Sequence, residues 1–448
     1  MAADTSEVVV KDASNECSHH DAGDSATLEA TLQSNPWNHG DCLLDFFEFE
    51  IEMHRKSPPD PPPQPDPPGE PRGLQARMQE AVVQLSKTHA SMARDGASDN
   101  AEFDWCLAES VFTVDNLRDF EWAYFHRIHR HNSVIHRPTF DCEKVSLPLL
   151  LAVFLFGSVY SAPLDSALSA RYFFECAEEY IYTHPTFRSL VDDLPTERGT
   201  VDEIQVLQAA VTIQTLQYGV NNKTTRRRIR VERHPHLVTA VRSAGFFQAK
   251  HGGPPTSWED FIRTETLVRK FRISVWTFLG DGFQAAFYNS PPMIALSELF
   301  GSLPCPESLF EAESACEFQQ LVCSRPRGPD PHSPSEFVSF LFHDTWPGPK
   351  HDMYSRLTAD HLLVIVMASD TIVRAADRWK LLWDSVVGQD PEQQRLQGFA
   401  KHAPELFWLT RAILHVAQSG DKSHGYMRGI VTDTLHEVHD FIRRYQNF

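Results

Sequence analysis

The stretch from Tyr124 to Phe140 reads YFHRIHRHNSVIHRPTF and places four histidines close together. They are His126, His129, His131 and His136. Neutral imidazole is a good zinc ligand, and two ligands on one helix share a face when they are three or four positions apart. His126 and His129 meet this spacing, whereas His129 and His131 do not. No carboxylate occurs between Glu121 and Asp141 to orient a ligand or act as a base. The pattern therefore disfavours a metal centre.

A second interpretation of this stretch needs no chemistry. The aromatic segment FEWAYFHRIHR has the character of a helix, and its last turn carries histidines and arginines, where the helix dipole favours positive charge. Pro138 biases the residue before it towards an extended conformation, so the chain would leave the helix here. On this interpretation the histidines belong to a structural junction.

Common catalytic motifs are missing from the sequence. It contains no phosphate-binding loop, no dinucleotide glycine fingerprint and no G-x-S-x-G elbow. The segment HEVH at His436–His439 is one residue short of the zinc-protease motif. We therefore expect a protein that is not an enzyme, with a histidine-lined pocket among the helices as the catalytic alternative.

Composition limits the partners. The 448 residues carry a formal net charge of -19, which argues against a chain that as a whole clamps DNA or an anionic membrane. None of the eight cysteines forms a C-x-x-C pair, so a small zinc module of the usual spacing is not expected. The apolar run at 147–160 is shorter than the roughly 20 residues that span a bilayer, and we interpret it as a core helix.

The first hundred residues differ from the rest. Residues 57–72 are rich in proline, which predicts a stiff spacer without regular hydrogen bonding. Just before it, DCLLDFFEFEIE at 41–52 alternates acids with Leu44, Phe46, Phe47 and Phe49. This pattern is typical of an activation segment whose aromatic side chains enter a partner's groove. A short helix or strand packed onto the main domain is an equal alternative.

Helical periodicity begins near Val111 and continues to the C-terminus, so the fold class is predicted to be all-α, a large helical bundle or array. In segment 168–182 the expected apolar stripe includes Leu168 and Tyr172, and in segment 201–219 the pattern stops at Gly219, an expected helix cap. We expect a largely disordered region at 1–105, a front portion at 110–320, a proline-rich loop at 321–337 and a back portion at 338–448.

The most basic stretch is KTTRRRIRVER, with Lys223, Arg226, Arg227, Arg228, Arg230 and Arg233. One interpretation is a nuclear-import signal or a patch that contacts phosphates. The other is a solvated helix face whose arginines pair with acids around it, and this is the interpretation we favour.

The histidine-rich stretch resembles the opening of the fungal-specific transcription factor domain, also called the middle homology region. Its motif residues here are His136, Arg137, Pro138, Thr139 and Phe140. The blocks LPLLLAVFLFGSVYS, ARYFFECAEEYIY, VDEIQVLQAAVTIQTLQYG, HLVTAVRSAGFF and the long segment from Ser257 follow in the family's order. The resemblance covers roughly residues 110–320 and implies a helical regulatory domain. In it, Pro138 would end the aromatic helix, and His136 and Arg137 would tie the helix end to neighbouring acids.

The same resemblance implies a nuclear transcriptional regulator of RNA polymerase II genes. Family members usually bind DNA through an N-terminal zinc module, and this sequence shows neither a six-cysteine cluster nor paired fingers. We therefore expect no cofactor in this chain and only weak or indirect DNA contact, with DNA binding supplied by a missing zinc module or a partner. The expected partners are the transcription machinery or other regulators, a second copy of the chain included, and no membrane. The alternative is a helical adaptor or scaffold that kept the fold.

Overall fold

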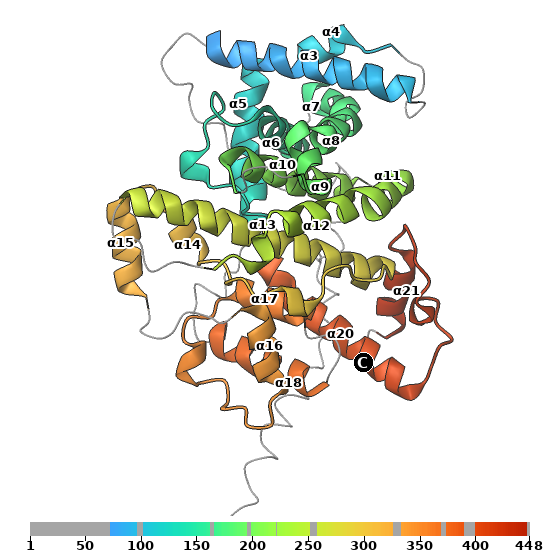
Figure 1. Ribbon diagram of the computed structural model, residues 1–448. Helices are drawn as coiled ribbons and strands as arrows, with labels where there is room; N and C mark the ends of the chain where they lie inside the picture. The colour runs from blue at the N-terminus through green and yellow to red at the C-terminus, as the bar shows by residue number, and fades with distance from the viewer. Residues whose placement is uncertain are drawn as a thin grey trace, which may run out of the picture.

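The computed structural model describes residues 72–95, 102–161, 165–194, 199–220, 222–250, 258–325, 333–368, 373–388 and 399–445. In these ranges the elements are helices and no β-strand, so the predicted all-α class is confirmed. The helices form stacked layers from α3 (Arg72–Arg94) at the top to α18 (Val373–Val386) at the bottom (Figure 1). The expected activation segment and nearly all of the proline-rich stretch lie outside the described residues.

The upper core is built around α6 (Leu147–Tyr160) and α10 (Val201–Gly219), which pack against each other. Every residue of α6 from Leu147 to Ser158 is buried, as expected for a helix that is apolar on all sides. Its prediction as a core helix is confirmed. Among the described residues, no helix combines the length and apolarity that crossing a membrane requires.

Helix α5 (Val114–Ala123) approaches α6 closely at one glycine. A Cβ atom added to Gly157 would lie 1.8 Å from the carbonyl oxygen of Phe120, so no side chain fits there. This close approach lets Phe120 pack edge-on against Phe154, with ring centroids 4.9 Å apart. The aromatic helix is thereby fixed against the core just before the histidine-rich stretch begins.

Helix α10 begins with a capping box. The Thr200 side chain accepts from the backbone of Glu203, and the Glu203 carboxylate accepts from the backbone of Thr200. The helix ends at Gly219, as the periodicity predicted, but this glycine does not cap it in the left-handed conformation. Val220 follows with φ -70°, so the chain leaves α10 as extended backbone.

Two expectations for the upper layers were wrong. Residues 72–94, placed in a largely disordered region, form α3, because Met78, Ala81, Val82 and Leu85 recur on one face and pack against α8 (Phe174–Thr183). Segment 168–182 is not one continuous helix either. It comprises the end of α7 (Asp165–Ser169), the 3-10 turn η6 (Ala170–Phe173) and most of α8.

That 3-10 turn changes which side chains face the core. Three residues per turn shift the apolar stripe relative to a continuous α-helix. Leu168 and Tyr172 are consequently exposed, Tyr172 at 78%, while Phe173, Phe174 and Cys176 are buried.

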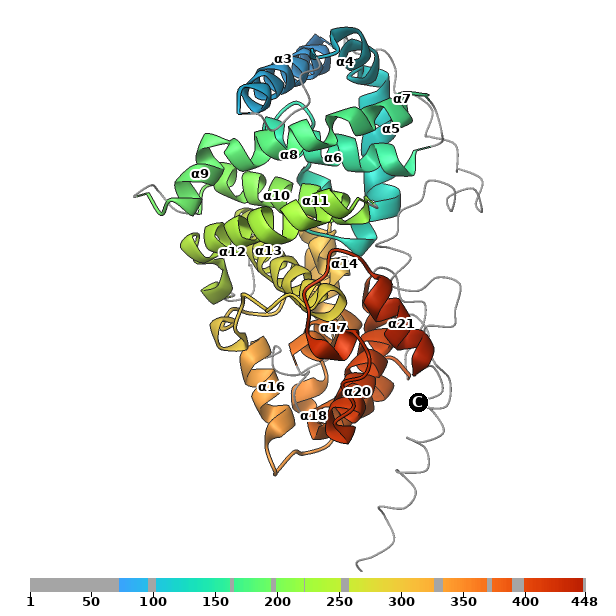
Figure 2. The ribbon, with the colours of Figure 1, turned by 90° about the vertical axis from the view of Figure 1, so that its right-hand side faces the viewer.

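Helix α13 (Trp258–Tyr288) crosses the middle of the molecule (Figures 1 and 2). It packs against α10 and α12 (His234–Ser243) above and against α17 (Ala359–Ala368) below. Three further helices complete the lower half: α16 (Pro334–Phe342), α18 and α20 (Ala403–Ser419). Trp379 is fully buried there, and its indole donates to the Leu362 carbonyl at 2.8 Å.

The remaining helices frame these layers. They are α4 (Trp105–Val111), α9 (Pro185–Val191), α11 (Lys223–Arg228), α14 (Glu307–Phe310), α15 (Ala315–Ser324) and α21 (His436–Arg444). The loop expected at 321–337 is shorter at both ends, since α15 continues to Ser324 and α16 starts at Pro334. A capping box of Ser333 with Glu336 fixes the start of α16.

Candidate functional site

The histidine-rich stretch does not form one helix that ends at Pro138. Helix α5 continues as a π turn, η3 (Tyr124–Ile128), and a 3-10 turn, η4 (His129–His131), where it stops. Pro138 lies later, in the separate 3-10 turn η5 (Arg137–Thr139). The prediction that this proline ends the aromatic helix was therefore wrong. The wider π turn changes the direction in which the side chains after Tyr124 point. The α-helical spacing of three or four residues therefore no longer predicts which histidines share a face.

The four histidines face four different surroundings. His126 lies on the surface, stacks on Trp122 at 4.4 Å and bonds to its carbonyl through Nδ1. His129 is buried and reaches Glu311, and His131 lies against the Phe399 ring. His136 is buried and bonds to Thr139. They therefore share no common centre.

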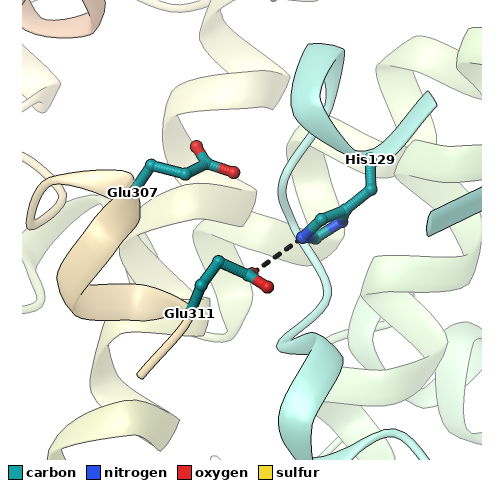
Figure 3. A group of neighbouring side chains, drawn as sticks. All are labelled: His129, Glu307 and Glu311. Carbon is teal, nitrogen blue, oxygen red and sulfur yellow. Dashed lines mark hydrogen bonds and ion pairs between the residues drawn. The ribbon is translucent and has the colours of Figure 1, made fainter. Parts of the chain in front are cut away.

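The partner of His129 comes from a distant part of the chain. Its Nε2 lies 2.8 Å from the Glu311 carboxylate, directly after α14 (Figure 3). Because a carboxylate only accepts, Nε2 carries the proton and donates it. Burial alone would raise the pKa of Glu311, but the hydrogen bond from His129 and the positive charge of Arg272 lower it below its usual value.

A second acid, Glu307, stands one turn earlier on α14 and accepts from the Ser133 hydroxyl at 3.0 Å. Arg272 of α13 also contacts both α14 and the segment after η4. Its guanidinium lies 4.1 Å from the centre of the Phe310 ring, donates to the carbonyls of Ser133 and Cys305, and stands 3.6 Å from Glu307. The segment after η4 is thus held between α13 and α14 by charge-assisted hydrogen bonds and a cation–π contact.

His129, Glu307 and Glu311 could also hold a metal ion, since their ligand atoms lie within 4.8 Å of one another. The two glutamates were missed in the sequence, because they lie far from the histidines along the chain. Their present partners argue for an ion-pair network instead. Arg272 supplies positive charge next to Glu307, and a divalent cation beside it would be repelled.

The motif residues 136–140 divide between core and surface. His136 is 1% exposed, its ring packs against Phe310, and Nδ1 lies 2.9 Å from the Thr139 hydroxyl. Arg269 of α13 donates to the same hydroxyl. Arg137 and Pro138 are exposed, and Phe140 is half-buried against Phe125.

Burial, followed by the positive charge of Arg269, lowers the pKa of His136 to about 3. His136 is therefore neutral in the folded protein at physiological pH. The tie to acids that the motif implied is made at this junction by His129 and Arg272, neither of which belongs to residues 136–140.

The basic stretch at 223–233 mostly faces inward. In α11 and the π turn η7 (Ile229–Arg233), Arg228 binds Glu178 through two bonds of 2.8 Å, and Arg233 binds the same carboxylate at 2.7 Å. Arg230 reaches Asp433 at 2.6 Å.

Arg226 of this stretch is buried, whereas Lys223 and Arg227 are exposed. The stretch therefore presents few charges to a partner in the folded chain. Its arginines join α11 and η7 to α8 and to the segment before α21.

A small histidine-lined cavity lies behind Arg272. His131 and His361 contribute to its walls, and its volume is about 40 Å³. That is room for a water molecule or two and not for a substrate. His361 uses both ring nitrogens, one with the Pro304 carbonyl and one with the Thr358 backbone. His131 and His361 therefore have no space for a substrate beside them in this cavity.

The sequence contained a weak sign of Arg272. It is a charged residue of α13 between the apolar residues Phe271 and Ile273, and all three are buried. A charge at a core position must be paired, and α14 supplies the acid.

Comparisons with known proteins agree with this architecture. Residues 123–343, from the end of α5 to just after α16, match the family model described as fungal specific transcription factor domain. Transcription factor verF of Penicillium polonicum is 30% identical over 249 residues, which cover 53% of this chain and 33% of verF. The chain thus spans about a third of the length of that relative. No solved structure matches.

The match includes both sides of the junction, with the histidine-rich stretch on one side and Arg272, Glu307 and Glu311 on the other. The family predicted from the order of the sequence blocks is confirmed. The chain therefore carries a fungal specific transcription factor domain over residues 123–343.

Proposed function

We propose that this chain is a nuclear transcriptional regulator of RNA polymerase II genes that acts through its helical domain. The observation that carries the proposal is the family match over residues 123–343, which includes every contact of the junction between η4, α13 and α14. Because these contacts join segments more than a hundred residues apart, the matched region packs as one folded unit.

A regulatory role fits the chemistry of the junction better than a catalytic one. Its titratable groups bind one another: His129 pairs with Glu311, and Arg272 stands between Ser133 and Glu307. Catalytic groups need a vacant space beside them for the reacting atoms. The adjacent cavity of about 40 Å³ does not supply it.

We propose that DNA is bound through a partner or a zinc module outside this sequence. The net charge of -19 opposes the approach of duplex DNA, and the arginines of α11 and η7 are largely bound to acids. The full chain should shift duplex DNA weakly and without sequence preference. A sequence-selective shift in the nanomolar range at physiological salt would contradict this.

The test of the function uses the full chain fused to a heterologous DNA-binding domain. A change in reporter transcription of severalfold, together with nuclear accumulation of a fluorescent fusion, is the expected result. A fusion that enters the nucleus and leaves the reporter unchanged would overturn the proposal and favour the helical adaptor. Light scattering of the purified chain tests the proposed second copy as a partner.

A further inference from the structure

The lower half of the fold contains a large cavity. A cavity of about 520 Å³ lies between the C-terminal half of α13, the segment at 289–296, α17, α20 and the turn at 426–429. Three other cavities among the described residues have volumes of about 20 to 40 Å³. Pockets that bind small molecules usually measure about 300 to 1,000 Å³.

Small residues of α13 leave this space open. Gly282, Ala285 and Ala286 line it at positions three or four apart, on the same face of the helix. A Cβ atom at Gly282 would lie 2.4 Å from the Met367 methyl, so α13 and α17 already touch there. Beyond that contact the opposite wall is formed by α17, α20 and the turn. Its side chains are mostly apolar, among them Val366, Leu406, Leu409, Ile413 and Met427, and Thr410 adds one hydroxyl.

Three polar side chains of the lining, Asp281, Asn289 and Tyr426, hold the walls of the cavity together. The Asp281 carboxylate accepts from His234 and from the backbone N–H groups of Met293 and Ile294. Asn289 donates to the Tyr426 carbonyl at 3.2 Å, and the Tyr426 hydroxyl donates to the Ala286 carbonyl at 2.6 Å. These bonds tie the segment after α13 and the turn at 426–429 to α13 itself.

The charge of the lining selects the ligand. The described lining residues include no lysine, arginine or histidine, and Asp281 is the one acid among them. An anionic molecule would be buried without a counter-ion and beside a carboxylate, at a high desolvation cost. A neutral, apolar molecule has no such desolvation cost, and it is stabilised by burial against aliphatic side chains.

We propose that this cavity binds a neutral, largely apolar small molecule. Phe278 and Ile294, within the matched domain, line one side, and Leu406 and Met427, beyond it, line the other, so an occupant would touch both parts of the fold. Binding itself is independent of the proposed function. The further statement that the bound molecule is the signal sensed by the regulator rests on the proposed function.

The test uses two fluorescent probes with the full chain. N-phenyl-1-naphthylamine is neutral and apolar, and 8-anilinonaphthalene-1-sulfonate has the same rings with a sulfonate. The neutral probe should show saturable binding to one site per chain, at least tenfold tighter than the anionic probe. Absence of saturable binding, or equal affinity for the two probes, would overturn the proposal.

A substitution in the cavity wall then tests whether the probe binds in this cavity. Ala286→Trp adds an indole to the wall and should weaken binding of the neutral probe at least tenfold. The matched control is Ala90→Trp on the exposed face of α3, which should leave affinity unchanged. If Ala286→Trp loses cooperative melting, Leu409→Trp at the opposite wall serves in its place. Unchanged affinity in the folded variant would overturn the proposal.

The reporter fusion separates the two proposals. A chain that changes reporter transcription and fails to bind the neutral probe contradicts the cavity proposal alone. A chain that binds the probe and leaves the reporter unchanged contradicts the proposed function alone.

Discussion

His234 donates from Nε2 to the Asp281 carboxylate over 3.1 Å, and both side chains are almost fully buried. The other ring nitrogen lies 3.2 Å from the Gln214 amide, whose oxygen in turn lies 3.3 Å from the Tyr182 hydroxyl. Polar groups of α8, α10, α12 and α13 therefore form one buried chain through the core. A chain of this kind is stabilising while every member is paired, and loss of one member leaves the rest unsatisfied.

Asp281→Ala tests this chain most directly. The substitution leaves the imidazole and the N–H groups of Met293 and Ile294 without their acceptor, so we expect a loss of about 3 to 5 kcal/mol in the free energy of unfolding. Urea unfolding of the full chain measures it. As a control, Asp440→Ala removes a carboxylate that pairs with Arg443 at the surface and should change stability little. Equal losses in the free energy of unfolding for the two substitutions would show that the buried chain of hydrogen bonds stabilises the fold no more than a surface ion pair does.

The basic stretch predicts different outcomes for its exposed residues and for the arginines that bind the buried Glu178. Lys223 and Arg227 are exposed, so replacing both with alanine should leave the melting temperature and nuclear accumulation unchanged. Replacing Arg228 and Arg233 with alanine removes both cations from the buried Glu178 and should destabilise the chain by several kcal/mol. Fluorescence microscopy and thermal melting separate the cases. Loss of nuclear accumulation in the first variant, with melting unchanged, would support an import signal instead.

His136 predicts how stability depends on pH. Its pKa falls from an ordinary value of 6.5 to about 3 in the folded chain, so below pH 6.5 the unfolded chain binds a proton that the folded chain does not. Its contribution is present above pH 6.5 and is lost as the pH falls towards 3. The slope is at most about 1.4 kcal/mol per pH unit.

The measurement compares urea unfolding of the wild-type chain and of His136→Asn between about pH 8 and about pH 5. Asparagine keeps a polar group near Thr139 and does not titrate, so the variant should lose less stability on acidification. His184 and His236, whose pKa values are also lowered by burial, contribute a background slope that the two proteins share. Identical slopes would contradict a neutral, buried His136.

Local pattern predicted much of this fold, and tertiary contact determined the rest. The apolar run at 147–160 predicted a buried helix, and the periodicity of α10 predicted its end at Gly219. The exposure of Tyr172 depends on a 3-10 turn for which its neighbours carry no clear signal. The pairing of His129 with Glu311 joins residues 182 positions apart, and no helical or strand period reaches that far.

The cluster of His129, Glu307 and Glu311 leads to a prediction about metal. The purified full chain should contain no stoichiometric zinc, because Arg272 already places a positive charge beside Glu307. Elemental analysis after dialysis against zinc measures the content. The control variant is Glu311→Gln, which removes one carboxylate and should leave the metal content at the same background level. One tightly bound zinc per chain that is lost in this variant would establish the cluster as a metal centre.

The segment DCLLDFFEFEIE, outside the described residues, supports the last prediction. If it is an activation element, Leu44, Phe46, Phe47 and Phe49 enter a partner's groove, and each buried side chain contributes on the order of 1.5 to 3 kcal/mol before ordering costs. Replacing the three phenylalanines with alanine should then abolish reporter activity of the tethered chain. The melting temperature should stay unchanged, since the proline-rich residues that follow would uncouple the segment from the helical domain.

The packing alternative predicts the reverse for the same triple variant. Buried aromatic residues replaced by alanine typically cost about 3 to 5 kcal/mol each, so the melting temperature would fall clearly. Both measurements on one protein therefore decide between the two interpretations.

A matched control replaces the acids Asp45, Glu48 and Glu50 with asparagine and glutamine, which keeps the aromatic rings and removes the charges. Because the charges keep the rings in solution until a partner binds, this control should reduce reporter activity less than loss of the rings. Retained reporter activity together with a lowered melting temperature in the phenylalanine variant would refute the activation role.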